Sequence, residues 1–158
     1  MNNSEIISVL EHIGELLEVK GENVYKSRSY NNAARAIKFL YEEVSELDAQ
    51  GRLSEITGVG EAISKKLHEL VTTGKLEYYE KLKAEFPSGI ESILNIPGIG
   101  PHTAAILINE LGIQNIDDLE IAILDVRLAK LPRMGDKTAQ NILRQIHIIK
   151  QLGNGPSK

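Results

Sequence analysis

The sequence contains no cysteine, and only 4% of its 158 residues are aromatic. Without cysteine it can form no disulfide, no thiolate zinc site and no cysteine nucleophile, and a reducing, cytoplasmic location is expected. Its apolar runs stay well below the roughly 18 residues that indicate a membrane span, and its first residues lack the order of a signal peptide. The four histidines have no metal-ligand spacing, which argues against a zinc or iron site.

Positive charge is also scarce, because 18 lysines and arginines face 22 acidic residues and the net charge is −4. This balance argues at first against nucleic acid, whose phosphates are usually contacted by lysine and arginine. The basic residues are concentrated, however, in two blocks, 20–40 and 127–158, while residues 86–126 contain no lysine or arginine. Such an asymmetry bears on partners rather than on the fold. The length suggests one domain or two very small ones.

The hydrophobic pattern predicts an all-α fold, because no segment alternates convincingly as a strand. Caps and glycine stops place the expected helices at 4–19, 29–44, 61–73, 76–85, 88–94, 101–111, 116–124 and 136–151. In the second of these, Tyr30, Ala33, Ala34, Ile37 and Tyr41 share one side. Another side carries the basic stripe Arg28, Arg35 and Lys38, which is either a DNA-contacting face or a solubilising surface. Residues 151–158 are expected to form a disordered tail.

A threefold internal repeat is the most informative feature of the sequence. Its copies read Leu-Ser-Glu-Ile-Thr-Gly-Val-Gly (53–60), Leu-Asn-Ile-Pro-Gly-Ile-Gly (94–100) and Leu-Ala-Lys-Leu-Pro-Arg-Met-Gly (128–135). Glycine permits a positive φ and lets a ligand come close to the backbone. The helix that follows offers unpaired N–H groups and the positive end of its dipole, which together can hold a phosphate without a formal charge.

This pattern resembles the helix-hairpin-helix motif, which implies binding to the DNA backbone without sequence specificity. The third copy departs from the motif, because Arg133 replaces the first glycine and a distorted turn is expected there. The residues expected at the phosphates are Gly58, Val59, Gly60, Gly98, Ile99, Gly100, His102, Gly135 and Lys137. Such turns can also serve only to pack helices, so a protein-interaction scaffold, suggested by the acidic segment 86–126, is the alternative function.

Five segments, in register, resemble the N-terminal region of family X DNA polymerases, the class that contains DNA polymerase beta and its bacterial and archaeal relatives. They cover 21–37, 56–67, 73–77, 96–101 and 111–119, and include Thr-Gly-Lys-Leu-Glu and Ile-Pro-Gly-Ile-Gly-Pro. The resemblance implies a lyase-type domain over 1–85 and a fingers-like domain over 86–150. It implies a DNA-binding module for repair that recognises gapped, nicked or damaged DNA. The palm domain has no counterpart here, so no polymerase activity is expected of this chain alone.

The same resemblance implies 5′-deoxyribose phosphate or abasic-site lyase activity through a Schiff-base lysine, which falls on Lys66. Helical spacing supports this choice, because Lys66 flanks the apolar stripe whereas Lys65 points away from it. Partial burial and nearby cations are the means of lowering the pKa of Lys66, as attack by a neutral amine requires. A solvated helix lysine without chemistry is the alternative interpretation.

Other residues of the implied lyase site match the family unevenly. Lys26 and Tyr30 match a lysine and a tyrosine of the family's 5′-phosphate pocket, and Tyr25 stands in place of a base-stacking histidine. Ala62, however, replaces a phosphate-binding lysine, and Glu61 adds negative charge beside the first turn. A weakened 5′-phosphate pocket is therefore expected.

The resemblance also implies a monovalent cation, Na⁺ or K⁺, that bridges the turns to the DNA phosphates. It would be held by the backbone oxygens of Ser54, Ile56, Val59, Leu94, Ile96 and Ile99. No other cofactor is expected. Besides DNA, the expected partners include a repair or polymerase protein but no membrane, and the relatives imply a nucleoid-associated prokaryotic protein.

Overall fold

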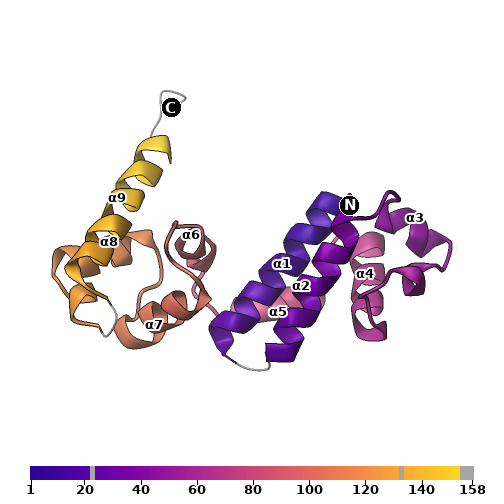
Figure 1. The fold of residues 1–158 in the computed structure, drawn as a ribbon, viewed down its shortest axis with the longest axis horizontal. Coiled ribbons are helices and arrows are strands. Elements are labelled where there is room, and N and C mark those ends of the chain that lie inside the picture. Colours follow the sequence, from indigo (N-terminus) through magenta and orange to yellow (C-terminus); the bar gives the residue numbers. More distant parts are fainter. Residues whose placement is uncertain (22–23, 132–133, 154–158) are drawn as a thin grey trace. The chain divides into compact units, whose positions relative to one another are not determined.

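The computed structural model describes residues 1–21, 24–131 and 134–153. Within those ranges every regular element is helical, so the all-α fold expected from the sequence is confirmed (Figure 1). The elements are α1 (Asn3–Lys20), α2 (Val24–Lys38), α3 (Val44–Ala49), η1 (Leu53–Glu55), α4 (Glu61–Thr73), α5 (Glu77–Ala84), α6 (Ile90–Leu94), α7 (Pro101–Leu111), α8 (Ile116–Leu124), η2 (Leu128–Lys130) and α9 (Asp136–Gly153). The elements labelled η are single 3₁₀ turns.

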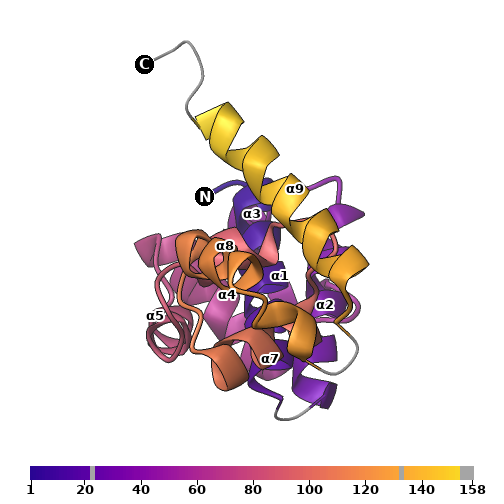
Figure 2. The ribbon, with the colours of Figure 1, turned by 90° about the vertical axis from the view of Figure 1, so that its left-hand side faces the viewer.

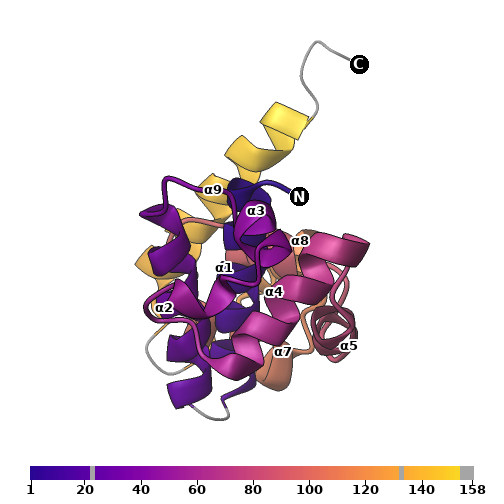
Figure 3. The ribbon, with the colours of Figure 1, turned by 90° about the vertical axis from the view of Figure 1, so that its right-hand side faces the viewer.

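The chain divides into two compact units, Met1–Glu85 and Phe86–Lys158. Figures 2 and 3 show the same helices turned by 90° about the vertical axis, from the left-hand and the right-hand side of the view in Figure 1. Among the described residues, no helix combines the length and the apolar content that a membrane crossing demands.

The first unit is built on the pairing of α1 with α2, which lie side by side (Figure 1). Apolar residues at helical spacing, such as Ile13 and Ile37, are completely buried on these two helices. The helices approach closely at Gly14, whose carbonyl oxygen accepts a hydrogen bond from the buried Ser27 hydroxyl at 2.9 Å. A Cβ at Gly14 would lie 2.6 Å from Asn31 Oδ1, so a small residue at this position allows the approach.

The expectation of one helix over 29–44 is wrong at both ends. α2 begins before residue 29 and ends at Lys38, where the next two residues donate their N–H groups three residues back instead of four. A separate helix, α3, begins at Val44, whose N–H group is held by Asn3 Oδ1 at 2.8 Å. Tyr41 lies between the two helices and is fully exposed, so it does not belong to the apolar side of α2.

The second unit contains α6, α7, α8, η2 and α9. Its fully buried residues include Ile93, Leu107, Leu119, Leu128 and Ile146. Lys150 ties α9 to α8, because its ammonium lies 2.7 Å from the Asp117 carboxylate and 3.0 Å from that of Glu120. The helix then continues to Gly153, so the expectation of a disordered tail is wrong for 151–153, where glutamine and leucine propagate a helix readily. Residues 154–158 lie outside the described part of the chain.

At Gly89 the backbone passes close to the segment that precedes α8. A Cβ at this position would lie 2.5 Å from the carbonyl oxygen of Gln114 and 2.9 Å from Asn115 Cβ. Because backbone atoms cannot rotate away, we expect Gly89→Ala to lower the free energy of unfolding by about 1–3 kcal/mol. Thermal unfolding followed by circular dichroism measures the loss.

Gly100→Ala is the matched control in the same unit, because a Cβ at Gly100 meets nothing within 4 Å. An equal loss of stability in Gly89→Ala and Gly100→Ala would contradict the steric explanation.

Candidate nucleic-acid interface

The first two copies of the repeat form tight turns with the same backbone geometry. The first glycine of each turn is left-handed, with φ of 94° at Gly58 and 95° at Gly98, a region that favours glycine. The apolar residue after it donates its N–H group to the carbonyl three residues back, over 3.2 Å in the first turn and 3.0 Å in the second. The second glycine of each turn is extended and forms the N-cap of the following helix.

The third copy closes its turn with the same hydrogen bonds. Met134 donates its N–H group to Leu131 at 3.1 Å, and Ala139 donates to Gly135 at 3.0 Å, as the equivalent residues do in the first two turns. Met134 is buried, like the apolar residue of the second turn. The distortion expected at Arg133 falls on a residue outside the described ranges.

The helices that follow the first two turns have open N-termini. No side chain caps α4 at Gly60 or α7 at Gly100, and a Cβ at either glycine would meet nothing within 4 Å. By contrast, Asn2 caps α1 and Asn115 caps α8 through their side-chain oxygens, whereas the N-cap residues of α3, α5 and α6 also lack a side-chain cap. The first N–H groups of α4 and α7 therefore have no acceptor from a capping side chain, and the open space beside each N-cap glycine leaves room for an external acceptor.

Side chains at these helix starts are exposed and differ between the turns. His102 supplies the first N–H group of α7, because Pro101 before it has none. Lys137 is exposed in the first turn of α9, at the same distance after its glycine. On α4, Ala62 is exposed, and the exposed Glu61 lies 3.7 Å from Lys65. In the first turn of α4, the side chain at position 62 is therefore an uncharged methyl group.

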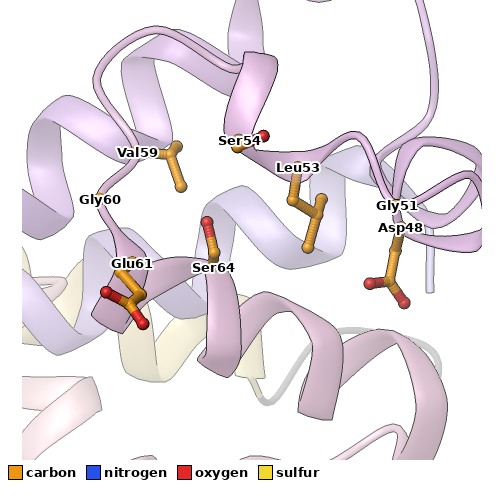
Figure 4. A pocket seen from close by; sticks show the side chains of 8 residues that line it. All are labelled: Asp48, Gly51, Leu53, Ser54, Val59, Gly60, Glu61 and Ser64. Atoms are coloured by element: carbon orange, nitrogen blue, oxygen red, sulfur yellow. The ribbon is translucent and has the colours of Figure 1, made fainter.

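A pocket of about 340 Å³ opens beside the first turn (Figure 4). Ser54, Val59 and Gly60 line it from the turn, Ser64 points its hydroxyl into it from α4, and Asp48 closes its far end. The Asp48 carboxylate lies 2.8 Å from the Nδ1 atom of His68.

The described residues contain no cluster of three histidine, aspartate or glutamate side chains that could hold a metal ion. Any cation at the turns would therefore depend on backbone oxygens. The carbonyls of Ile56 and Ile96 each accept one N–H group within their turn. A carbonyl has two lone pairs, so each keeps one for a further partner.

A second cluster lies in the first unit, where side chains of α2, α4 and α5 meet. Tyr30 of α2 stacks on Tyr78 of α5, with ring centroids 6.0 Å apart and planes 6° from parallel. The Nζ atoms of Lys26, from α2, and Lys66, from α4, each lie 4.9 Å from the centroid of the Tyr78 ring. The structure thus brings together Lys26, Tyr30 and Lys66, three residues that the resemblance assigned to one site.

The environment of this cluster shifts two pKa values. Burial lowers the pKa of Lys66, the positive charge of Lys26 lowers it further, and Glu69 opposes both. Burial also raises the pKa of Tyr30, assisted by its interactions with Tyr78, so Tyr30 remains a neutral phenol. Lys65 lies on the exposed side of α4, so only Lys66 of this pair is partly withdrawn from water, as helical spacing predicted.

The outer face of α2 carries the exposed residues Tyr25, Arg28 and Arg35, and the exposed Phe39 directly follows the helix, four residues after Arg35. Tyr25 and Phe39 are each 78% exposed. Lys38, which the sequence placed in the same stripe, lies at the border with α1, where its Nζ atom is 3.5 Å from Glu11 Oε2.

Sequence reasoning missed two residues of these surfaces. Phe39 lies four residues after Arg35, inside the helix expected over 29–44, so the spacing of the stripe could have identified it. Tyr78 gave no such signal, because it belongs to a helix beyond Gly74, and only the fold places that helix against α2 and α4.

Comparison with known families agrees with this geometry. A family model described as a Helix-hairpin-helix domain matches residues 1–76, which include the first turn. A second model, described as a SAM-like Helix-hairpin-helix tandem, matches residues 90–147, which include the other two turns. Both parts of the chain therefore have the sequence signature of this motif.

Curated relatives extend the likeness. The DNA polymerase/3′-5′ exonuclease PolX of Bacillus subtilis is 31% identical over 146 residues, which are 92% of this chain and 25% of that protein. RuvA subunits of the Holliday junction branch migration complex from Geotalea daltonii and Desulforamulus reducens are 26% and 29% identical over 98 and 94 residues. These matches cover 61% and 59% of this chain and 49% and 47% of the two RuvA proteins.

The chain thus spans a quarter of its PolX relative and about half of its RuvA relatives. Both family models describe the helix-hairpin-helix motif that the turns display. The chain is a helix-hairpin-helix region of the kind found at the N-terminus of PolX-like proteins, and its resemblance to the family X DNA polymerases is confirmed.

Proposed function

We propose that this chain is a DNA-binding module of the polymerase X type that recognises gapped, nicked or damaged DNA in repair. One observation carries the proposal: α4 and α7 each begin behind a glycine turn without a side-chain cap, and a Cβ on either N-cap glycine would meet nothing within 4 Å. Amides in this position bind phosphate through N–H donors and the positive end of the helix dipole. An acidic chain can therefore bind DNA at these two helix starts.

Side chains of α2, together with Phe39 directly after it, add a second kind of contact. Arg28 and Arg35 can reach phosphates, and the exposed rings of Tyr25 and Phe39 offer flat surfaces on which unpaired bases stack. Unpaired bases occur in gaps and at lesions but not within an intact duplex. The combination of backbone amides with exposed rings therefore favours interrupted DNA as the ligand.

The names of the relatives agree with a DNA ligand, since one is a DNA polymerase and the others belong to a Holliday junction complex. From these names, only DNA as the ligand is carried over to this chain. Polymerase and exonuclease activity are not proposed for this chain. A monovalent cation between the turn carbonyls and the phosphate is part of the proposal, because those carbonyls keep a free lone pair.

The proposal includes lyase activity at Lys66. The neutral amine would attack C1′ of the ring-opened abasic sugar, and loss of the carbonyl oxygen as water would leave an iminium. Removal of a C2′ proton and cleavage of the C3′–O3′ bond would then free the 5′-phosphorylated DNA end, and hydrolysis would restore the lysine. The lowered pKa of Lys66 and the nearby ammonium of Lys26, a candidate for the 5′-phosphate, support this step.

A protein-interaction scaffold is the second candidate, and one observation favours it for the second unit. Ile121 and Leu124 are 54% and 67% exposed on α8, within the acidic segment 86–126. Exposed apolar residues in such a segment suit a protein partner better than DNA. A pull-down that uses the whole chain as bait, with its Ile121→Ser variant as control, tests this candidate.

We expect Gly60→Ala and Gly100→Ala each to weaken DNA binding about tenfold, since the added methyl group blocks a charge-assisted phosphate contact. Both glycines have a negative φ that alanine also adopts, so folding should be little affected. Fluorescence anisotropy with a 5′-phosphorylated gapped duplex measures the Kd.

Asn109→Ala is the matched control, because Asn109 is exposed on α7 far from its N-terminus. Wild-type affinity in Gly60→Ala and Gly100→Ala, or equal affinity of the wild type for gapped and intact duplex, would contradict the proposal. Binding should weaken only shallowly with salt, because few side-chain charges take part.

We expect borohydride to trap a covalent adduct between the protein and abasic DNA, and Lys66→Ala to lower the yield about a hundredfold or more. Attack needs the neutral amine, and the pKa of Lys66 is lowered. The trapping rate should therefore rise with pH and level off below the ordinary lysine value of 10.5.

Lys65→Ala is the control for this experiment, because Lys65 is its exposed neighbour on α4. Undiminished trapping by Lys66→Ala, or loss of trapping only in Lys65→Ala, would show that Lys66 is not the nucleophile.

A further inference from the structure

Tyr78 is the centre of the lysine cluster, although neither sequence nor resemblance drew attention to it. Its ring is contacted by two ammonium groups, from Lys26 and Lys66, each at 4.9 Å from the centroid. These lysines belong to different helices, α2 and α4, and Tyr78 belongs to a third, α5. The ring is therefore the group that the two amines have in common.

Two ammonium groups repel each other, so something must offset the cost of bringing them together. This repulsion destabilises the protonated form of Lys66, because the charge of Lys26 lowers the pKa of Lys66. Glu69 is the carboxylate that acts on Lys66, but its Oε2 atom also accepts the N–H group of Glu77 at 2.7 Å. The face of an aromatic ring attracts cations without carrying a negative charge. Tyr78 supplies such a face to both lysines.

Tyr30 holds the Tyr78 ring in place. Its own ring is 3% exposed and stacks almost parallel on Tyr78. A stacked, buried neighbour restricts the orientation of the Tyr78 ring. The charged and titratable groups that act on Lys66 or contact it are thus Lys26 from α2, Glu69 from its own helix and Tyr78 from α5, and Tyr30 reaches the cluster through Tyr78.

We propose that Tyr78 is a positioning residue for the Schiff-base reaction at Lys66, an inference that rests on the proposed lyase function. Its ring holds the Lys66 amine next to Lys26 while leaving Lys66 able to lose its proton. The iminium formed on Lys66 is again a cation and remains over the same ring. A carboxylate at this position would attract both lysines as well, but it would hold Lys66 in the protonated form and prevent attack.

The test compares three substitutions that separate the ring, its hydroxyl and its charge. Tyr78→Phe keeps the ring and should trap abasic DNA within about threefold of the wild type. Tyr78→Leu removes the ring, and trapping at neutral pH should fall about tenfold. Tyr78→Glu should trap poorly at neutral pH and recover as pH rises, because its carboxylate raises the pKa of Lys66.

Tyr79→Leu is the matched control for the loss of a tyrosine from α5. Tyr79 makes a similar contact with a different lysine, since Lys83 Nζ lies 4.3 Å from its ring centroid, and its ring meets His12 edge-on. The Tyr79→Leu variant, shown to be folded by circular dichroism, should therefore trap abasic DNA through Lys66 at about the wild-type level.

A second measurement needs no DNA. In protein labelled with ¹³C-lysine, the pH dependence of the Lys66 Cε signal, assigned by its loss in Lys66→Arg, reports the pKa of Lys66. Because the ring face stabilises the ammonium form, we expect this pKa to fall further below the ordinary lysine value in Tyr78→Leu, to rise in Tyr78→Glu, and to change little in Tyr78→Phe and Tyr79→Leu.

The two measurements distinguish the two proposals. If no protein traps abasic DNA but the pKa of Lys66 follows the expected order, the lyase function fails and the positioning of Lys66 by Tyr78 is supported. If the wild type traps and Tyr78→Leu changes neither the yield nor the pKa, the lyase function is supported and the role of Tyr78 is overturned.

Discussion

The left-handed backbone at Gly58 and Gly98 is the constraint on which both turns depend. A φ near +95° is disfavoured for residues with a Cβ, so these two bends are available only where glycine stands. The bend turns the apolar residue after it toward the protein and leaves the next glycine exposed as the N-cap of a helix. One backbone conformation therefore closes the turn and opens the helix N-terminus.

The same constraint explains how an acidic chain can have a DNA-binding face. Segment 86–126 contains no lysine or arginine, yet it holds the second turn and the open start of α7. Partial charges on backbone amides are fixed by the fold and are not counted in the net charge. A net charge of −4 thus describes the surface as a whole but does not describe the two helix starts.

Features that depend on neighbouring residues in the sequence could be predicted. Features that depend on contacts between distant segments could not. The ends of α1, α4 and α7 were predictable because Gly21, Gly74 and Gly112 form their C-caps. The end of α2 and the start of α3 were missed, since Asn3, 41 residues away, holds the first N–H group of α3. The partial burial of Lys66 followed from helical spacing, but its contact with Tyr78 depends on how α5 packs.

The two units contribute different chemistry to the proposed function. In the first unit an open helix start, a row of exposed rings and arginines, and the lysine pair around Tyr78 all occur within 85 residues. In the second unit the turns recur without a comparable lysine and tyrosine cluster among its described residues. Backbone amides bind any phosphate, whereas attack on an abasic sugar requires an amine that can lose its proton. In the proposed function, the repeated turns therefore supply the contacts to the DNA backbone, and the first unit supplies the amine for the abasic sugar.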